Sequence, residues 1–260
     1  MWVAISAGIA SVVISSLCIV AFLGRFVGTF TVSLDTGNVE LALSDKGTFE
    51  KMDSFLRINA IPTFHEFSYS SLPADDVLDS DETDYLTGAF YEEDGKTPNS
   101  MNYFKYTFFV RNIGKITARY IMKINITDNK AGENGRTLDD TLRVMLYDND
   151  AIDTNHKKVV YAKRAAVHHI NEDGVADFHE PISVSEDGAN EFEPFAGYAE
   201  MFETSSCIAT LVVDSFVPGE TRRYTIVNWL EGYDPQSNNY SAPPKGARIK
   251  LGVEINAYEI

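Results

Sequence analysis

Hydrophobic and polar side chains alternate along residues 103–112 and again along residues 118–127. Side chains two positions apart share one face of a strand, so each run is typical of a half-buried β-strand. Asn112, Ile113 and Gly114 lie at the junction, and Asn and Gly tolerate the positive φ of a tight turn. We therefore expect the two runs to pair antiparallel as a hairpin. A hairpin alone is not stable in water, so other strands must cover its apolar face.

Further runs with strand character lie on both sides of this region. They are residues 29–34, 39–43, 55–61, 141–147, 157–163, 208–213, 223–231 and 249–258. The first two flank a turn sequence at 35–38 and predict a second hairpin. Many short runs with turns between them predict an all-β fold, an antiparallel β-sandwich of jelly-roll or Greek-key type. We expect its two sheets to bury the following side chains between them: Phe104, Tyr106, Phe108, Tyr120, Met122, Ile124 and Val144.

Residues 1–25 differ from the rest of the chain in composition. Residues 1–23 carry no charged side chain, and as a helix they would span roughly 35 Å, enough to cross a hydrocarbon core of about 30 Å. The apolar run is longer than the core of about 7–15 residues in a secretory signal and lacks a basic segment before it. We therefore expect an uncleaved transmembrane signal-anchor helix at 1–25, followed by one domain at 26–260.

The orientation of this helix depends on the charges that flank it. Arg25 is the cation nearest to the apolar run, and taken alone it favours a cytoplasmic location for the domain that follows. A basic segment upstream of the apolar run would reverse that preference. We expect a single-pass protein of the cell membrane with residues 26–260 outside the cell.

The chain is strongly acidic, with 22 Lys and Arg against 38 Asp and Glu and a formal net charge of −16 at pH 7. Such a surface repels phosphate backbones, which predicts that nucleic acid is not a partner. It also disfavours adsorption onto anionic lipid, so contact with a membrane is expected through the N-terminal helix alone. High charge of one sign is typical of a surface that keeps an exposed protein soluble.

Carboxylates gather in two places along the chain. They are residues 75–84, with Asp75, Asp76, Asp79, Asp81, Glu82 and Asp84, and the group Asp148, Asp150 and Asp153 after a predicted strand. Calcium prefers several oxygen ligands, so either group could hold a structural calcium ion. The first group lacks the glycine at the sixth position of a calcium loop. We expect a long loop at residues 68–102 and a solvated turn after residue 147.

Cysteine and histidine provide no recognisable catalytic or metal motif. Cys18 lies in the N-terminal apolar run and Cys207 begins another, so no disulfide framework is expected within the domain. We interpret Cys207 as a small buried residue. His65-Glu66 and His179-Glu180 lack the second histidine of the His-Glu-x-x-His zinc motif, and His168-His169 has no such partner either. We assign no catalytic, cofactor-binding or metal-binding residue and expect a protein that is not an enzyme.

Several motifs together are similar to one group of proteins. They are Gly-Thr-Phe-Thr-Val-Ser-Leu at 28–34, Leu-Ala-Leu-Ser-Asp at 41–45, Tyr-Thr-Phe-Phe-Val-Arg-Asn-Ile-Gly at 106–114, Leu-Asp-Asp-Thr-Leu-Arg-Val at 138–144, Pro-Gly-Glu at 218–220 and Trp-Leu-Glu-Gly-Tyr-Asp-Pro at 229–235. With the apolar N-terminus, this set resembles uncharacterised membrane-anchored surface proteins of Gram-positive bacteria, distantly related to the TasA and camelysin group. The chain departs from them in having Gln236-Ser237 where they carry a cysteine, and in lacking their basic N-terminal tail.

The resemblance implies a jelly-roll sandwich, export and, for TasA-like members, assembly into extracellular fibres. We expect a structural or adhesive protein at the cell surface. One alternative is a TasA-like subunit of a fibre or biofilm matrix that assembles by strand donation, with residues 27–34 as the donor. A second alternative is a peptidase, as camelysin-like members are classed.

Overall fold

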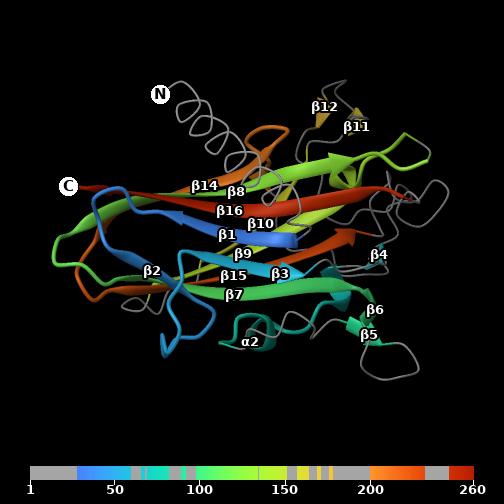
Figure 1. The fold of residues 1–260 in the computed structure, drawn as a ribbon. Coiled ribbons are helices and arrows are strands. Elements are labelled where there is room, and N and C mark those ends of the chain that lie inside the picture. The colour runs from blue at the N-terminus through green and yellow to red at the C-terminus, as the bar shows by residue number, and fades with distance from the viewer. Residues whose placement is uncertain are drawn as a thin grey trace, which may run out of the picture.

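Two β-sheets stack face to face in the computed structural model of this chain (Figure 1), which confirms the prediction of an all-β sandwich. The structure describes residues 28–59, 66–67, 69–81, 89–91, 98–133, 135–150, 157–163, 169–170, 176–177, 200–231 and 246–260. The helix predicted at residues 1–25 lies outside these ranges. Within them, no helix combines the length and the apolar character that crossing a bilayer requires.

The smaller sheet has five strands in the order β14-β8-β16-β1-β3. Their bounds are β14 Cys207–Phe216, β8 Ala118–Lys130, β16 Arg248–Glu259, β1 Gly28–Asp35 and β3 Phe55–Asn59. β1 is an interior strand, parallel to β16 on one side and antiparallel to β3 on the other. The remaining pairs in this sheet are antiparallel.

The larger sheet has six strands in the order β13-β10-β9-β15-β7-β2, and a short strand, β4, extends it beside the end of β15. Their bounds are β13 Glu200–Met201, β10 Lys157–Ala162, β9 Leu142–Asp150, β15 Thr221–Glu231, β7 Tyr103–Asn112, β2 Leu41–Ser44 and β4 Glu66–Phe67. β15 is the central strand, antiparallel to both β7 and β9, as the nearly continuous apolar run at 223–231 predicted.

Short elements complete the described part of the chain. They are the 3₁₀-helices η1 Tyr69–Ser71 and η2 Leu138–Asp140, the one-turn helix α2 Asp75–Leu78, and two small antiparallel pairs, β5 Ala89–Tyr91 with β6 Pro98–Met101 and β11 His169–Ile170 with β12 Ala176–Asp177. The prediction of a long loop at residues 68–102 was therefore wrong for the described part of this segment, which contains η1, α2, β5 and β6. Local periodicity did not reveal these elements because each is only two to four residues long.

The core lies between the inner faces of the two sheets. All seven side chains predicted to be buried there are buried and belong to one cluster, including Phe104 and Phe108 from the larger sheet and Tyr120 and Met122 from the smaller. The side chain of Phe30 in β1 of the smaller sheet packs against Phe104 in β7 of the larger sheet, with 5.4 Å between their ring centroids. The predicted strands at 141–147, 157–163, 208–213, 223–231 and 249–258 are all confirmed.

The hairpin predicted from residues 103–127 is wrong, because its two runs belong to different sheets. β7 pairs with β15 and β2, whereas β8 pairs with β14 and β16. The connection at 113–117 therefore carries the chain from one sheet to the other (Figure 1), and the inner faces of both runs contribute to the same core. Alternation reports which face of a strand is buried, but a hairpin and a crossing between sheets produce the same pattern.

The residues taken for a hairpin turn have another role in this crossing. The side-chain amide of Asn112 donates to the carbonyl oxygens of Ile116, at 2.9 Å, and Phe216, at 2.7 Å, while its oxygen accepts the backbone N–H of Gly114 at 3.0 Å. Gly114 does not adopt positive φ. A Cβ there would lie 3.2 Å from Cβ of Glu40, so this glycine permits the close approach of two segments.

The second predicted hairpin is also wrong. β1 belongs to the smaller sheet and β2 to the larger, so the turn at 36–39, where Val39 N–H donates to Thr36 at 2.8 Å, again connects the two sheets. β1 pairs within its own chain, but with β16 and β3. Gly37 in this turn has φ of +50°, which glycine adopts without strain.

β7 is buried on both faces, although its alternation predicted burial on one. On the outer face Phe109 lies against Phe49, with 6.3 Å between ring centroids. Farther along the same face, Lys105 and Thr107 are buried beneath residues 69–81. This covered part of the larger sheet holds the densest group of polar contacts that we describe.

Candidate functional site

Residues 69–81, which we call the strap, cross the outer face of the larger sheet and include η1 and α2 (Figure 1). Apolar side chains form a second, smaller core beneath the strap. They are Leu78, Tyr103, Met145, Tyr147, Val160, Val227 and Trp229. Leu78, only 1% exposed, is the strap's buried aliphatic residue in this group, and the Tyr69 ring lies 6.0 Å from the Trp229 ring. The strap makes the sandwich three layers deep at this place.

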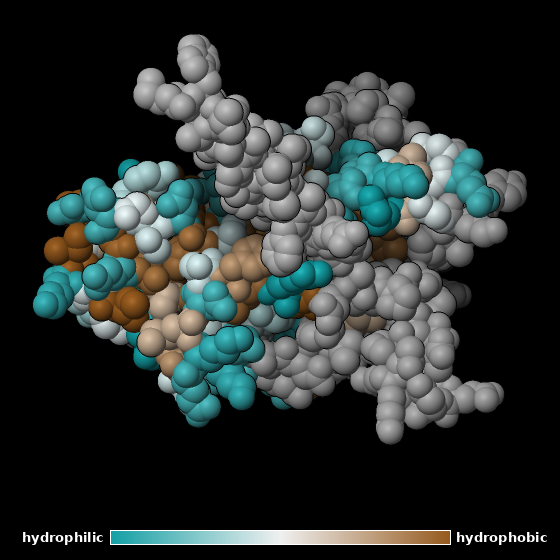
Figure 2. Space-filling model, in the orientation of Figure 1, coloured by the Kyte–Doolittle hydropathy of each residue, from teal (hydrophilic) through white to brown (hydrophobic). Residues whose placement is uncertain are grey.

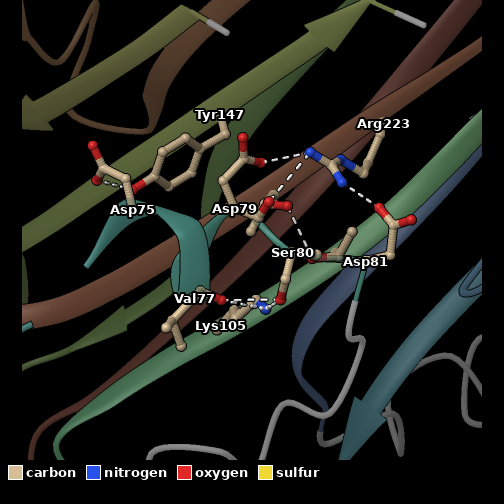
Figure 3. A network of polar contacts seen from close by, with 10 residues as sticks. Asp75, Val77, Asp79, Ser80, Asp81, Lys105, Tyr147 and Arg223 are labelled. Carbon is tan, nitrogen blue, oxygen red and sulfur yellow. Dashed lines mark hydrogen bonds and ion pairs between the residues drawn. The ribbon is translucent and has the colours of Figure 1, made fainter. Parts of the chain in front are cut away.

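The buried lysine of β7 holds the middle of the strap (Figure 3). Lys105 is only 2% exposed, and its Nζ donates to the carbonyl oxygen of Val77 at 3.1 Å and to Oγ of Ser80 at 2.6 Å. Thr107, two residues along, donates to the carbonyl oxygen of Ser80 at 3.2 Å. Because buried polar groups are costly unless hydrogen-bonded, these contacts hold the strap against the sheet.

Arg223 of β15 binds the end of the strap. Its Nη2 lies 3.0 Å from Oδ1 of Asp79, and its Nη1 pairs with the carboxylate of Asp81. The same guanidinium also donates to the carbonyl oxygen of Asp79 at 3.3 Å. Figure 3 shows the guanidinium between the two carboxylates. Arginine suits this position because its planar group presents several donors in fixed directions.

Asp75 connects the beginning of α2 to two strands. Its carboxylate accepts hydrogen bonds from the Tyr147 hydroxyl at 2.7 Å and from Nζ of Lys158 at 2.8 Å. Partial burial acts to raise the pKa of Asp75, but the hydrogen bonds from Lys158 and Tyr147 outweigh it and lower that pKa. Burial and the hydrogen bond to Asp75 raise the pKa of Tyr147. Lys158 is partly desolvated, yet its contact with Asp75 raises its pKa, so both partners are charged at neutral pH.

A buried carboxylate anchors the first residue of the strap. Glu231, at the end of β15, is fully buried and accepts the backbone N–H of Tyr69 at 3.1 Å and the indole N–H of Trp229 at 2.9 Å. The Trp-Leu-Glu motif at 229–231 is therefore part of the strap's attachment. Two N–H groups thus donate to this buried carboxylate, which meets part of its need for hydrogen-bond partners.

A separate polar group lies where β10 ends near η2. Nζ of Lys163 is 2.6 Å from Oδ2 of Asp139 and 2.7 Å from Oδ1 of Asp140. Burial acts to raise the pKa of Asp139, but hydrogen bonds from Lys163, Thr137 and Asn129 outweigh it and lower that pKa. A cation already occupies the space between the two carboxylates, so this group is arranged as a structural contact.

Several of the carboxylates that were considered as alternative calcium ligands have cations as partners. Asp75, Asp79 and Asp81 bind the cations of the sheet, and Arg222 lies 3.8 Å from Asp148. Glu82, Asp84 and Asp153 lie outside the described residues. Within the described ranges, no group of three or more His, Cys, Asp and Glu side chains is placed to hold a metal ion.

The interpretation of Cys207 as a small buried residue is confirmed in part. This residue is half-buried at the start of β14, and burial raises the pKa of its thiol, which disfavours the reactive thiolate. Its Sγ lies 3.5 Å from Oε2 of Glu203. Cys18, His65, His168 and His179 lie outside the described residues.

A few apolar side chains are exposed at one end of the sandwich, where the connections β7–β8 and β14–β15 lie. Figure 2 shows brown surface at this end, and Ile113, Ile116 and Val217 in these connections are 46%, 39% and 43% exposed. Three aliphatic residues spread over two connections are ordinary for a protein surface. We therefore do not assign this end as a binding site.

Sequence reasoning identified the acidic residues but missed the cations that bind them. Lys105 and Arg223 stand in strands that are rich in aromatic and β-branched residues, and polar residues at such positions are a signal of partners on the outer face. No protein-family model, curated protein sequence or solved structure matches this chain significantly. The fold and its contacts define a β-sandwich whose larger sheet carries an ionically attached strap.

Proposed function

We propose that this chain is a structural or adhesive protein without enzymatic activity, held in the cell membrane by residues 1–25. In this proposal residues 26–260 lie outside the cell as a sandwich of jelly-roll or Greek-key topology. The observation that carries the proposal is that the cations of the strap site are bound by the strap itself. Lys105, Lys158 and Arg223 each contact the strap, so their charges serve attachment. The acidic composition suits exposure to an aqueous exterior.

The location is tested by treating intact cells that produce the full chain, tagged at its carboxyl end, with an external protease. We expect the tag to be lost while a cytoplasmic marker protein is retained. A matched chain without residues 1–25 should leave the membrane fraction, because the apolar segment supplies the membrane affinity. Protection of the tag in intact cells, with loss after lysis, would overturn the proposed orientation.

The absence of enzymatic activity is tested by elemental analysis of the purified chain. We expect neither zinc nor iron at a stoichiometric level. Bound calcium would be compatible with a structural or adhesive role, since carboxylate and carbonyl oxygens suit that ion. Stoichiometric zinc or iron, together with cleavage of a protein substrate that a chelator abolishes, would replace this proposal with a peptidase.

The second candidate function is that of a fibre subunit formed by strand donation, and the position of β1 favours it. Phe30 and Val32 of β1 are buried in the core, in a slot between β16 and β3. The same strand from a neighbouring copy could fill that slot with identical contacts. Electron microscopy of the chain released from the membrane tests this function. Filaments that disappear when residues 27–34 are deleted would support it, and a monomer at all concentrations would exclude it.

A further inference from the structure

The strap has features of a segment that opens separately from the sandwich. It pairs with no strand edge, and the N-cap residue of α2, Ala74, makes no side-chain capping hydrogen bond. Leu78 is deeply buried, but its neighbour Val77 is 46% exposed. Tyr69 and Leu72 also pack, partly buried, against the second core, and the remaining attachments described above are hydrogen bonds and ion pairs. The carboxylates of Asp75 and Asp81 in these ion pairs are exposed to solvent, where salt weakens them. Segments with few buried apolar contacts open at lower free energy than the core of a fold.

The face beneath the strap has a particular chemistry. An apolar centre around Tyr147 and Trp229 is bordered by Lys105, Lys158 and Arg223, in a chain whose formal net charge is −16. A fitting ligand carries carboxylates on both sides of a leucine and presents one backbone carbonyl and one hydroxyl group to Lys105. The strap has this pattern, with Asp75 before Leu78 and Asp79 and Asp81 after it. The ligand that best complements this face is therefore a strap.

We infer that the strap is exchangeable between copies: it can leave its own sheet and occupy the same face of a second copy, which returns its strap in the same way. The partner is thus a second copy of this chain, and the product is a dimer with reciprocal symmetry. Every contact made within one chain is made again between chains, so exchange conserves the interactions of Arg223, Lys105 and Lys158. The equilibrium between the monomer and the exchanged dimer then depends on the connecting segments and on protein concentration. The inference holds with or without the proposed role at the membrane.

Complementary charge reversal tests the exchange directly with full-length chains in detergent. One variant carries D79K and D81K in the strap, and the other carries R223E in the sheet. Within each variant chain, residues 79 and 81 of the strap and the side chain at position 223 carry charges of the same sign. In a mixture, reciprocal exchange matches both straps, because the reversed strap meets Glu at 223 and the native strap meets native Arg223. We expect the mixed sample to contain at least about tenfold more dimer than either variant alone, because juxtaposed like charges are costly.

Native mass spectrometry identifies the expected species as a heterodimer. The chain with all three substitutions restores the match within one copy, and it should behave like the wild type in both dimer content and unfolding. A control pair replaces D79K and D81K with E50K and E259K, which change the same charge at exposed positions away from the strap. This control should form no excess of heterodimer with R223E. A mixture of the complementary variants that stays monomeric, while the triple variant behaves like the wild type, overturns the inference.

Hydrogen exchange of the wild-type chain provides a test that does not depend on the folding of any variant. The backbone amides of residues 75–81 should exchange faster than those of β15, and this difference should grow with salt concentration because salt weakens the ion pairs. Exchange of the strap only together with the core strands would mean that the strap does not open separately, and the inference would fail. If the strap opens, the heterodimer assay decides whether it exchanges between copies.

Discussion

The hydroxyl groups of Tyr120 and Tyr224 form a hydrogen bond with 2.5 Å between their oxygens, and it joins the two sheets inside the core. Tyr120 belongs to β8 of the smaller sheet and Tyr224 to β15 of the larger. Burial is the main cause that raises the pKa of both tyrosines, so both are neutral over the physiological range. A polar contact in an apolar layer is satisfied in one alignment of the sheets, so this pair favours a single packing arrangement.

We predict that the Tyr120 and Tyr224 substitutions are not additive. Tyr120→Phe should lower the free energy of unfolding by about 1–3 kcal/mol, because it leaves the buried hydroxyl of Tyr224 without this partner. Tyr120→Phe with Tyr224→Phe should cost less than the sum of the two single substitutions, since no orphan hydroxyl of the pair remains. Urea unfolding of the four chains measures the coupling. Simple additivity would mean that the short contact contributes nothing to stability.

The crossing between the sheets should depend on Asn112. Asn112→Ala removes the donors to the carbonyl oxygens of Ile116 and Phe216, the second of which is in a buried hydrogen bond. We expect a loss of about 1–3 kcal/mol in unfolding free energy, because a buried acceptor is left unpaired. Asn256→Ala is the control, since its side chain is bonded to Glu254 at an exposed site. Equal losses in the two variants would contradict this role for Asn112.

Lys105 should control how tightly the strap is held. Lys105→Met keeps an aliphatic side chain of similar length but removes the hydrogen bonds to Val77 and Ser80. We expect limited proteolysis to cleave within the strap faster, because cleavage requires local opening. The control is Lys123→Met, at an exposed position of β8. If Lys105→Met is cleaved at the wild-type rate, these hydrogen bonds do not determine how the strap opens.

Attachment of the strap should weaken in acid. Because Lys158 and Tyr147 lower the folded-state pKa of Asp75, its ionised form stabilises the fold above the unfolded pKa of about 3.9, and this stabilisation is lost as pH falls through the folded-state value. Asp75→Asn should therefore reduce the unfolding free energy at pH 7 and have progressively less effect toward pH 3. The neighbouring Asp76→Asn is the control on the same helix. A constant difference across this range would exclude Asp75 as the titrating group.

The local pattern of the sequence by itself determined where most strands lie and which faces they bury. Leu142, Val144 and Leu146 were predicted on one face of a strand, and all three lie in the core. β16 likewise buries Leu251 and Val253 as its alternation predicted. This succeeds because the period of two is a property of the strand's own backbone, independent of which strand lies beside it.

Only the tertiary structure decided which strands pair. Residues 103–112 and 118–127 are separated by five residues, yet they lie in different sheets, where each pairs along both edges with strands that are distant in sequence. Both arrangements bury the same alternating side chains, so hydrophobic pattern does not distinguish them. The hydrogen bond from Asn112 to Phe216, 104 positions away, stabilises the crossing in the folded chain.

The tertiary structure also decided the partners of the charged residues. Asp79 and Asp81 are separated from Arg223 by more than 140 positions, and Asp75 is 83 positions from Lys158. From sequence these carboxylates were interpreted as a solvated loop with calcium as an alternative, since their neighbours in sequence are polar. Charge interactions act through space, so the choice between solvent, a metal ion and a distant cation depends on which side chains the fold brings within a few ångströms.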